Sequence, residues 1–253
     1  MRLDVTVRNL EEIPAVLKII QDCKVKAVDI TNLHRSVDPL EVARLLKESI
    51  PSLDIALYFS AKFFLEGSIE SARALFRKKF EEAKKMGIKR FLFVSGHPRA
   101  SFDVLEMLRV INDLRLSNEC EIFCAYNPYF DPGRLREEQD RLRTKLAFPF
   151  VTGIALQVGM DTQKLQKGIE QIRLIRPDVV LLGSIPVPNE ITLEQLKVNA
   201  LYGVFLPNSY LLSVDMASEM TVALLQAFRT LKIEPIVFTP QVEGVQEALK
   251  LFK

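Results

Sequence analysis

Short apolar runs alternate with longer amphipathic runs along the whole chain. The apolar runs are rich in β-branched residues, and the amphipathic runs carry apolar residues three and four positions apart, so the pattern predicts alternating strands and helices. The predicted strands are 2–8, 25–31, 53–60, 88–95, 120–126, 149–157, 178–183 and 234–239. The predicted helices are 10–22, 38–49, 68–86, 102–116, 134–147, 161–175, a long stretch through 192–231, and 241–252.

Several predicted helix boundaries have a local chemical cause. Asp38 is followed directly by a proline, and this pair is typical of an N-cap and a first helical residue. Ser68, Asp161 and Thr192 stand where a side-chain oxygen accepts hydrogen bonds from the first turn of a helix. Gly87 is expected to end the helix that begins after Ser68.

The alternation favours one fold class. Eight strands and about eight helices in about 250 residues are the count of a (β/α)₈ TIM barrel, an α/β fold. A doubly wound open sheet is the alternative. No linker, low-complexity segment or change of composition divides the chain, so we expect residues 1–253 to form a single domain.

Composition and charge exclude several classes of protein. The chain has 253 residues, 48% of them hydrophobic and 26% charged, as in ordinary globular proteins. A formal net charge of +2 gives no reason to expect a nucleic-acid partner. The apolar stretches are too short to span a membrane, and the N-terminus lacks a secretory pattern. Three cysteines without framework spacing favour the reducing cytoplasm.

Polar residues gather in the segments that end or follow the predicted strands. In a parallel barrel the carboxyl ends of the strands form one face, where enzymes of this fold have their active sites. Both histidines, His34 and His97, fall in these segments. The other polar residues found there include Thr31, Asn32, Arg35, Tyr58, Ser60, Ser95, Asn127, Tyr129, Asp131 and Gln157. The sequence predicts a functional face here, although polar residues also collect in loops for general reasons.

Motifs for several other chemistries are missing. The two histidines are far apart in the sequence, and neither has a carboxylate or cysteine cluster at ligand spacing, so we expect no metal site. The sequence contains no G-x-x-x-x-G-K phosphate loop, no G-x-G-x-x-G fingerprint and no G-x-S-x-G serine elbow. Acid–base chemistry remains, with Asp4, Asp29, His97 and Asp131 as candidates.

Asp4 belongs to a polar face of the first predicted strand. It has the same parity as Arg2 and Thr6, whereas Leu3 and Val5 form the opposite face. A polar set inside a barrel is costly unless it forms a hydrogen-bonded network or serves a site. Two interpretations therefore stay open for Asp4, a structural role with Arg2 and a role in a functional site.

Several short motifs occur in the order known from one family of barrels. They are VDITNLHRS after the second strand, GIKRFLFVSGHP at the fourth, CAYNPYFDP with RLRTKLA at the fifth, LQVGMD at the sixth, VVLLGSIPVPN at the seventh and IEPIVFTPQ at the eighth. In this order, over essentially the whole chain, the sequence resembles the catalytic barrel of the methylenetetrahydrofolate reductase family. The strongest single motif is the turn at 183–187, GSIPV.

The resemblance implies an oxidoreductase of one-carbon metabolism that binds FAD and passes a hydride from NAD(P)H through the flavin to a methylene-folate. Matched position by position, Asp4 stands where the family has its glutamate acid, and His97 stands at the aspartate of its R-G-D; we expect one of them to donate a proton. Gln157 matches the glutamine that binds the folate substrate. The flavin-binding set implied by the resemblance is Thr31, Tyr58, Ser95, Gly96, His97, Asn127, Asp131 and Lys145.

A second function, from a different class, also stays open. A non-catalytic or regulatory relative would keep the barrel and bind a pterin or a protein partner without flavin chemistry. The apolar run 201–228 bears on a possible homo-oligomer, because it either packs as a helix on the barrel, which is the favoured interpretation, or covers an interface.

Overall fold

The computed structural model describes residues 2–31, 37–64, 67–95, 101–198 and 203–239, and their strands form a closed barrel. All neighbouring strands are parallel, and β1 pairs with β8, which rules out an open sheet. The TIM barrel predicted from the sequence is therefore confirmed. The strands are β1 (Arg2–Val5), β2 (Ala27–Ile30), β3 (Asp54–Ser60), β4 (Arg90–Val94), β5 (Glu121–Tyr126), β6 (Val151–Leu156), β7 (Val180–Pro186) and β8 (Ile233–Thr239).

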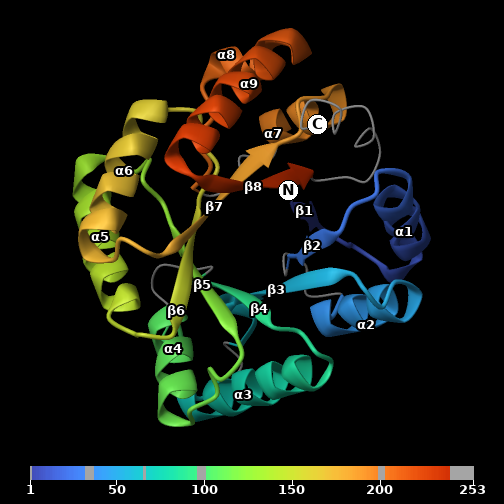
Figure 1. Cartoon of the computed structure of the whole chain (residues 1–253), viewed down its shortest axis with the longest axis vertical. Helices are drawn as coiled ribbons and strands as arrows, with labels where there is room; N and C mark the ends of the chain where they lie inside the picture. The colour runs from blue at the N-terminus through green and yellow to red at the C-terminus, as the bar shows by residue number, and fades with distance from the viewer. Residues whose placement is uncertain (1, 32–36, 65–66, 96–100, 199–202, 240–253) are drawn as a thin grey trace.

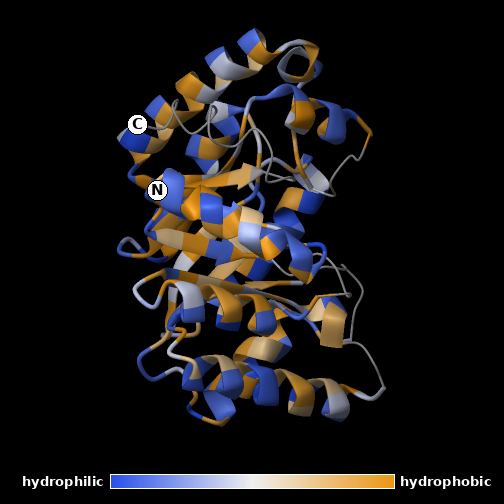
Figure 2. Cartoon of the chain, turned by 90° about the vertical axis from the view of Figure 1, so that its right-hand side faces the viewer, coloured by the Kyte–Doolittle hydropathy of each residue, from blue (hydrophilic) through white to orange (hydrophobic). Residues whose placement is uncertain are grey.

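Helices surround the barrel as an outer ring (Figure 1). They are α1 (Ile13–Asp22), α2 (Pro39–Ser49), α3 (Ile69–Lys85), α4 (Val104–Asp113), α5 (Pro132–Leu146), α6 (Thr162–Ile175), α7 (Glu190–Val198), α8 (Asn208–Leu212) and α9 (Val214–Leu231), with short 3₁₀ turns η1 (Leu10–Glu12) and η2 (Ala61–Phe64). The helices that face the viewer in Figure 2 carry both hydrophilic and hydrophobic residues along their length. None of the described helices is both long and apolar enough to cross a membrane.

Most of the predicted helix boundaries are confirmed. Asp38 accepts a hydrogen bond from the backbone N–H of Leu40 at 3.1 Å, and Ser68 accepts one from Ser71 at 3.2 Å. Asp161 caps α6 in the same way. Gly87 follows α3 with a φ of +77°, a left-handed conformation that costs glycine nothing.

The long predicted stretch 192–231 is wrong as a single helix. It is divided among α7, α8 and α9, with the left-handed Gly203 (φ +80°) between α7 and α8. Thr192 is not an N-cap, because α7 begins at Glu190 and the Asn189 side chain accepts the N–H of Thr192 at 2.7 Å. The predicted helix 241–252 lies outside the described residues. The last helix of the stretch, α9, packs against β7, β8 and α6, in agreement with the favoured interpretation of the run 201–228.

The largest part of the core lies between the strands and the helices, and its densest region is a cluster of phenylalanines. Phe76 of α3 is fully buried, and its ring lies 5.6–6.0 Å from five neighbouring rings, counted between centroids. Those neighbours are Phe59, Phe64, Phe80, Phe93 and Phe102. Edge-to-face contacts of this kind add to the stabilisation gained from burying the rings.

The barrel interior has its own smaller apolar cluster. Its members are Tyr58, Leu92, Phe123, Ala155, Leu182 and Ile236. The ring of Phe123 fills the space beside β6, because a Cβ on Gly153 would lie 2.0 Å from that ring. Glycine at 153 is therefore the residue that lets an aromatic side chain fill this part of the barrel.

Replacing Phe76 tests how far stability depends on the phenylalanine cluster. We expect Phe76→Ala to lower the free energy of unfolding by about 3–5 kcal/mol, since it leaves a cavity among five rings. Leu75→Ala is the matched control, because Leu75 is adjacent on α3 and 38% exposed. Urea unfolding followed by circular dichroism measures both changes, and equal losses in the two variants would contradict the role given to the cluster.

Candidate functional site

A buried ion pair occupies the barrel interior. The Arg2 side chain is 1% exposed, and its guanidinium pairs with Asp29 and Asp54. It also donates to the carbonyl of Val28 at 3.1 Å. The hydroxyl of Tyr58 donates to the second carboxylate oxygen of Asp29 at 3.1 Å. Burial raises the pKa of Asp29, and the charge and hydrogen bonds of Arg2 oppose that rise.

Asp4 lies beside this ion pair, but its hydrogen bond does not come from Arg2. It stands opposite Asp29 in the register of β1 and β2, and parallel pairing points both side chains to the same face. Arg2 bonds to Asp29, whereas the hydrogen bond of Asp4 comes from Thr31, at 2.9 Å. The hydroxyls of Thr6 and Thr31 are 2.8 Å apart and continue this polar chain toward the carboxyl ends of the strands.

The surroundings of Asp4 favour its neutral form. Burial and the negative charge of Asp29 raise the pKa of Asp4 well above its ordinary value, and the hydrogen bond from Thr31 opposes this only in part. The same surroundings raise the pKa of Tyr58, so its phenol stays protonated as a donor. Thr31 can bond to Asp4 in either protonation state. Its hydroxyl donates to the ionised carboxylate, and when Asp4 is protonated it can instead donate to the carbonyl of Val5, 3.2 Å away, and accept the proton of Asp4. The interior thus holds a buried carboxylic acid that can give up a proton.

Two side-chain amides meet at the rim above the interior. Asn127 follows β5 and donates to the carbonyl of Gly203 at 2.9 Å, while its own oxygen accepts the N–H of Tyr129 at 3.0 Å. Gln157 follows β6, and its side-chain oxygen accepts the N–H of Val158 at 3.0 Å. A Cβ on Gly203 would lie 3.1 and 3.2 Å from the amide nitrogens of Asn127 and Gln157. The bare backbone at 203 therefore lets its segment cover both amides closely.

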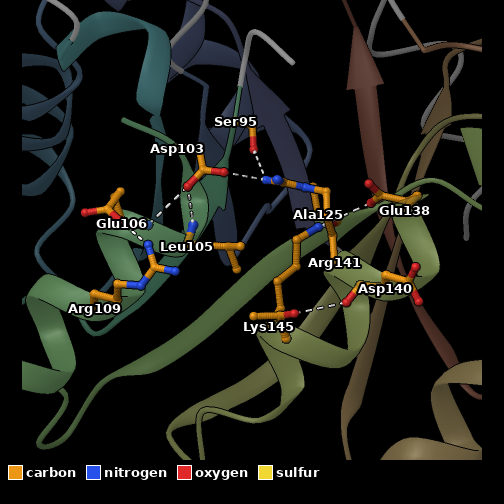
Figure 3. A network of polar contacts seen from close by, with 11 residues as sticks. Ser95, Asp103, Leu105, Glu106, Arg109, Ala125, Glu138, Asp140, Arg141 and Lys145 are labelled. Carbon is orange, nitrogen blue, oxygen red and sulfur yellow. Dashed lines mark hydrogen bonds and ion pairs between the residues drawn. The ribbon is translucent and has the colours of Figure 1, made fainter. Parts of the chain in front are cut away.

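A second polar network lies in the outer layer (Figure 3). Arg141 of α5 donates to Ser95 at 3.1 Å and to Asp103 at 2.8 Å. Lys145 is buried behind β5, where its ammonium donates to the carbonyl of Ala125 at 2.7 Å and to Glu138 at 3.2 Å. The charged helix α5 is thus not only a solvated surface, because these two cations turn toward the strands.

The structure sorts the predicted site residues into three groups. Asp4, Thr31 and Tyr58 form the interior network, and Asn127 and Gln157 meet at the rim. Ser95 and Lys145 are held in the outer layer, where Asp131 caps α5 by accepting the N–H of Arg134. Gly96 and His97 lie outside the described residues, as does His34.

Sequence reasoning missed two residues of this region. Arg141 gave no signal, because its helix has the charge pattern of an exposed surface. Gly203 gave none either, because no motif surrounds it. Ser60, which was expected among the polar residues at the strand ends, ends the polar face of β3, and its buried hydroxyl has no hydrogen-bond partner among the described residues.

Four of the predicted flavin-binding residues that the structure describes are already engaged within the protein. Thr31 and Tyr58 donate to interior carboxylates, Asn127 donates to backbone, and Lys145 is enclosed between α5 and β5. Asp131 places a carboxylate where the start of α5 would otherwise attract a phosphate. These side chains do not fit the phosphates of a dinucleotide, so flavin stays a prediction of the resemblance. Within the described residues, no group of three or more His, Cys, Asp or Glu side chains is arranged to hold a metal ion.

Comparisons with known proteins support the fold. No family model matches the sequence, and no curated protein matches it. An uncharacterized protein from Clostridium thermocellum, whose structure binds two copies of 5-methyl-5,6,7,8-tetrahydrofolic acid, aligns with a TM-score of 0.67 at 13% identity, over 99% of this chain and 92% of that chain. A chitinase from Chromobacterium violaceum aligns with a TM-score of 0.60 at 7% identity, over 99% and 98%. At these identities the likeness shows the barrel alone, and membership of the reductase family is not confirmed.

The pKa of Asp4 predicts a specific dependence of stability on pH. The unfolded carboxyl titrates near pH 3.9, whereas the folded one keeps its proton to higher pH, so rising pH favours the unfolded wild type. We expect Asp4→Asn to unfold at higher urea concentration than the wild type at pH 7, with a gap that shrinks toward pH 4. Urea midpoints from pH 4 to 8 measure it, and a constant gap would show that Asp4 is not held neutral.

Lys145 can be tested for a structural role separately from a cofactor role. We expect Lys145→Ala to lower the free energy of unfolding by about 1–3 kcal/mol, because Glu138 and the Ala125 carbonyl lose a buried donor. Lys167→Ala, on the exposed side of α6, is the control. The resemblance instead predicts that Lys145→Ala weakens flavin binding by about 1–3 kcal/mol. Wild-type stability together with weakened flavin binding would favour the cofactor role.

Proposed function

We propose that this barrel binds a reduced folate at the carboxyl ends of its strands and acts on its one-carbon group, as a methylenetetrahydrofolate reductase-like enzyme. The observation that carries the proposal is Asp4, a buried acid beneath a rim of amide and hydroxyl groups, whose pKa is raised well above its ordinary value by burial and by Asp29. The sequence resemblance supports folate as the substrate class. The tetrahydrofolate-binding barrel from Clostridium thermocellum supports it as well.

Recognition of the pterin is assigned to the rim. A reduced pterin carries N–H donors beside a carbonyl oxygen on one edge, so it pairs with side chains that both donate and accept. Gln157 and Asn127 each carry an amide with both functions, and Ser60 contributes a hydroxyl. Backbone groups already bond to both amide functions of Asn127 and to the side-chain oxygen of Gln157, which fixes their orientation before the ligand arrives and leaves the amide N–H groups of Gln157 for the pterin.

The chemical role of Asp4 is proton donation. In a methylene-folate the one-carbon group bridges two nitrogens. Reducing it to the methyl form adds a hydride to this carbon and breaks one of its two bonds to nitrogen, and the released nitrogen takes a proton. A neutral carboxyl is suited to this transfer near pH 7. The negative charge of Asp29 then favours return of the proton to Asp4 after each cycle. The hydride would come from NAD(P)H, and His97 is the second candidate for the proton.

A binding protein without redox chemistry is the second candidate function. The specific observation in its favour is that Thr31, Tyr58 and Lys145, which the resemblance assigns to flavin, bond within the protein. Such a protein would bind the pterin at the same rim and be colourless after purification. The wild-type absorbance spectrum in the flavin band, before and after incubation with FAD, separates the two candidates.

The decisive variant for the proposal is Asp4→Asn. We expect it to bind 5-methyltetrahydrofolate like the wild type but to reduce methylene-folate with NAD(P)H about 10²–10⁴-fold more slowly. The rate of NAD(P)H oxidation, followed by absorbance, measures turnover of both proteins. Turnover of Asp4→Asn at the wild-type rate would remove Asp4 from the chemistry and leave His97 as the acid.

Ligand binding alone is tested at Gln157. We expect Gln157→Ala to weaken binding of 5-methyltetrahydrofolate by about 1–3 kcal/mol, measured by calorimetry and by the ligand-induced rise in Tm. Gln163→Ala, on exposed α6, controls for the loss of an amide elsewhere. Failure of the wild type to bind any reduced folate would overturn the proposed function.

A further inference from the structure

A groove of about 410 Å³ opens on the same face as the rim amides. It is lined by Tyr129 after β5, by Met160, Asp161 and Lys164 around the start of α6, and by 205–207. Most of this lining is apolar and comes from three separate loops. A volume of this size is in the range of small-molecule sites.

The apolar walls of the groove are fixed by backbone contacts. Phe205 bridges to Gly159, with its N–H donating to Val158 at 3.1 Å and its carbonyl accepting from Met160 at 3.3 Å. The ring of Tyr129 lies against Gly159, where a Cβ would come within 2.5 Å of the ring. The rings of Tyr129 and Phe205 are 6.2 Å apart between centroids. The Phe205 side chain is 38% exposed, which is high for a phenylalanine held this firmly.

One cation stands at the edge of these walls. The ammonium of Lys164 donates to the carbonyl of Tyr129 at 3.2 Å, which places it at the groove and leaves it further protons to donate. Asp161 caps α6 by accepting the N–H groups of Gln163 and Lys164, so part of its charge is offset by the helix start. The groove thus combines an aromatic wall with one ammonium group, that of Lys164, beside the carboxylate that caps α6.

The groove is lined by residues that lie close along the chain to the rim where the pterin is proposed to bind. Gly203 covers the amides of Asn127 and Gln157, and Phe205 follows it by two residues, a reach of about 7 Å at most. Gln157 likewise precedes Met160 by three residues. The distance from a ligand bound at the two amides to the groove is therefore about the length of one aromatic group.

We propose that this groove binds the benzoylglutamate arm of the folate, with the benzoyl ring against Phe205 and Tyr129 and the glutamate carboxylates at Lys164. The inference rests on the proposed function and assigns it a second subsite. The arm consists of a flat aromatic ring and an anionic end, which match in kind the aromatic wall and the ammonium of the groove. Ring contacts provide affinity, and the lysine distinguishes a folate from an uncharged pterin.

The test compares two probes on matched variants. The probes are 5-methyltetrahydrofolate, which carries the arm, and 6-methyltetrahydropterin, which lacks it. The variants are Phe205→Ala and Lys164→Gln; the controls are Leu212→Ala, at a side chain 74% exposed, and Lys167→Gln on the same helix. Calorimetry gives the dissociation constants, and melting curves verify that each variant is folded.

We expect both groove variants to bind 5-methyltetrahydrofolate about 5- to 20-fold more weakly and to bind the pterin like the wild type. In Lys164→Gln the binding should also depend less on salt, because a charge contact is lost. Unchanged folate affinity in both variants overturns the subsite and leaves the proposed function standing. If the wild type binds neither probe, both proposals fail. If p-aminobenzoylglutamate alone binds and the variants lose it, while the pterin never binds, the groove is upheld and the proposed function is not.

Discussion

The buried pair of Arg2 and Asp29 is the constraint on which the barrel interior depends. Removing two charges from water is costly, and the cost is met only when every polar group around them is satisfied. Arg2 meets this condition through Asp29, Asp54 and the Val28 carbonyl, and Asp29 through Arg2 and Tyr58. These bonds join β1, β2 and β3 across the inside of the barrel, which orders the N-terminal strands relative to one another.

The same pair determines the chemistry of its neighbour. Because Arg2 is committed to Asp29, Asp4 is left with a hydroxyl partner and a nearby negative charge. Two carboxyl groups on one face of adjacent strands thus have different partners: Asp29 pairs with a cation, whereas Asp4 has a hydroxyl donor, and burial raises the pKa of both. Different surroundings of this kind are a general way to separate the pKa values of two neighbouring titratable groups.

The fold was predictable from the sequence to a much greater extent than the site. Alternating strand and helix patterns, with caps such as Asp38 and Ser68, act over a few residues and are visible in a linear chain. The division of 192–231 was not predicted, because Gly203 and Pro207 interrupt a stretch whose apolar content continues across them. Side chains alternate between the two faces of a strand, and this alternation correctly predicted that Asp4 lies inside the barrel. The sequence could not show that Arg2 would bond to Asp29 rather than Asp4, nor that Lys145 would turn inward, because those outcomes depend on distances between separate elements.

The backbone bridge between Gly159 and Phe205 bears on how such a rim can evolve. In most barrels each loop after a strand varies independently of its neighbours. Here the segment before α8 pairs with the one after β6, and Gly203 contacts the amides of two further loop positions. An insertion or substitution in either segment would shift the other, so the two are expected to change together during divergence. Ligand preference in this barrel would then depend on both loops together. Transferring only one of the two loops from a relative would not transfer that relative's ligand preference.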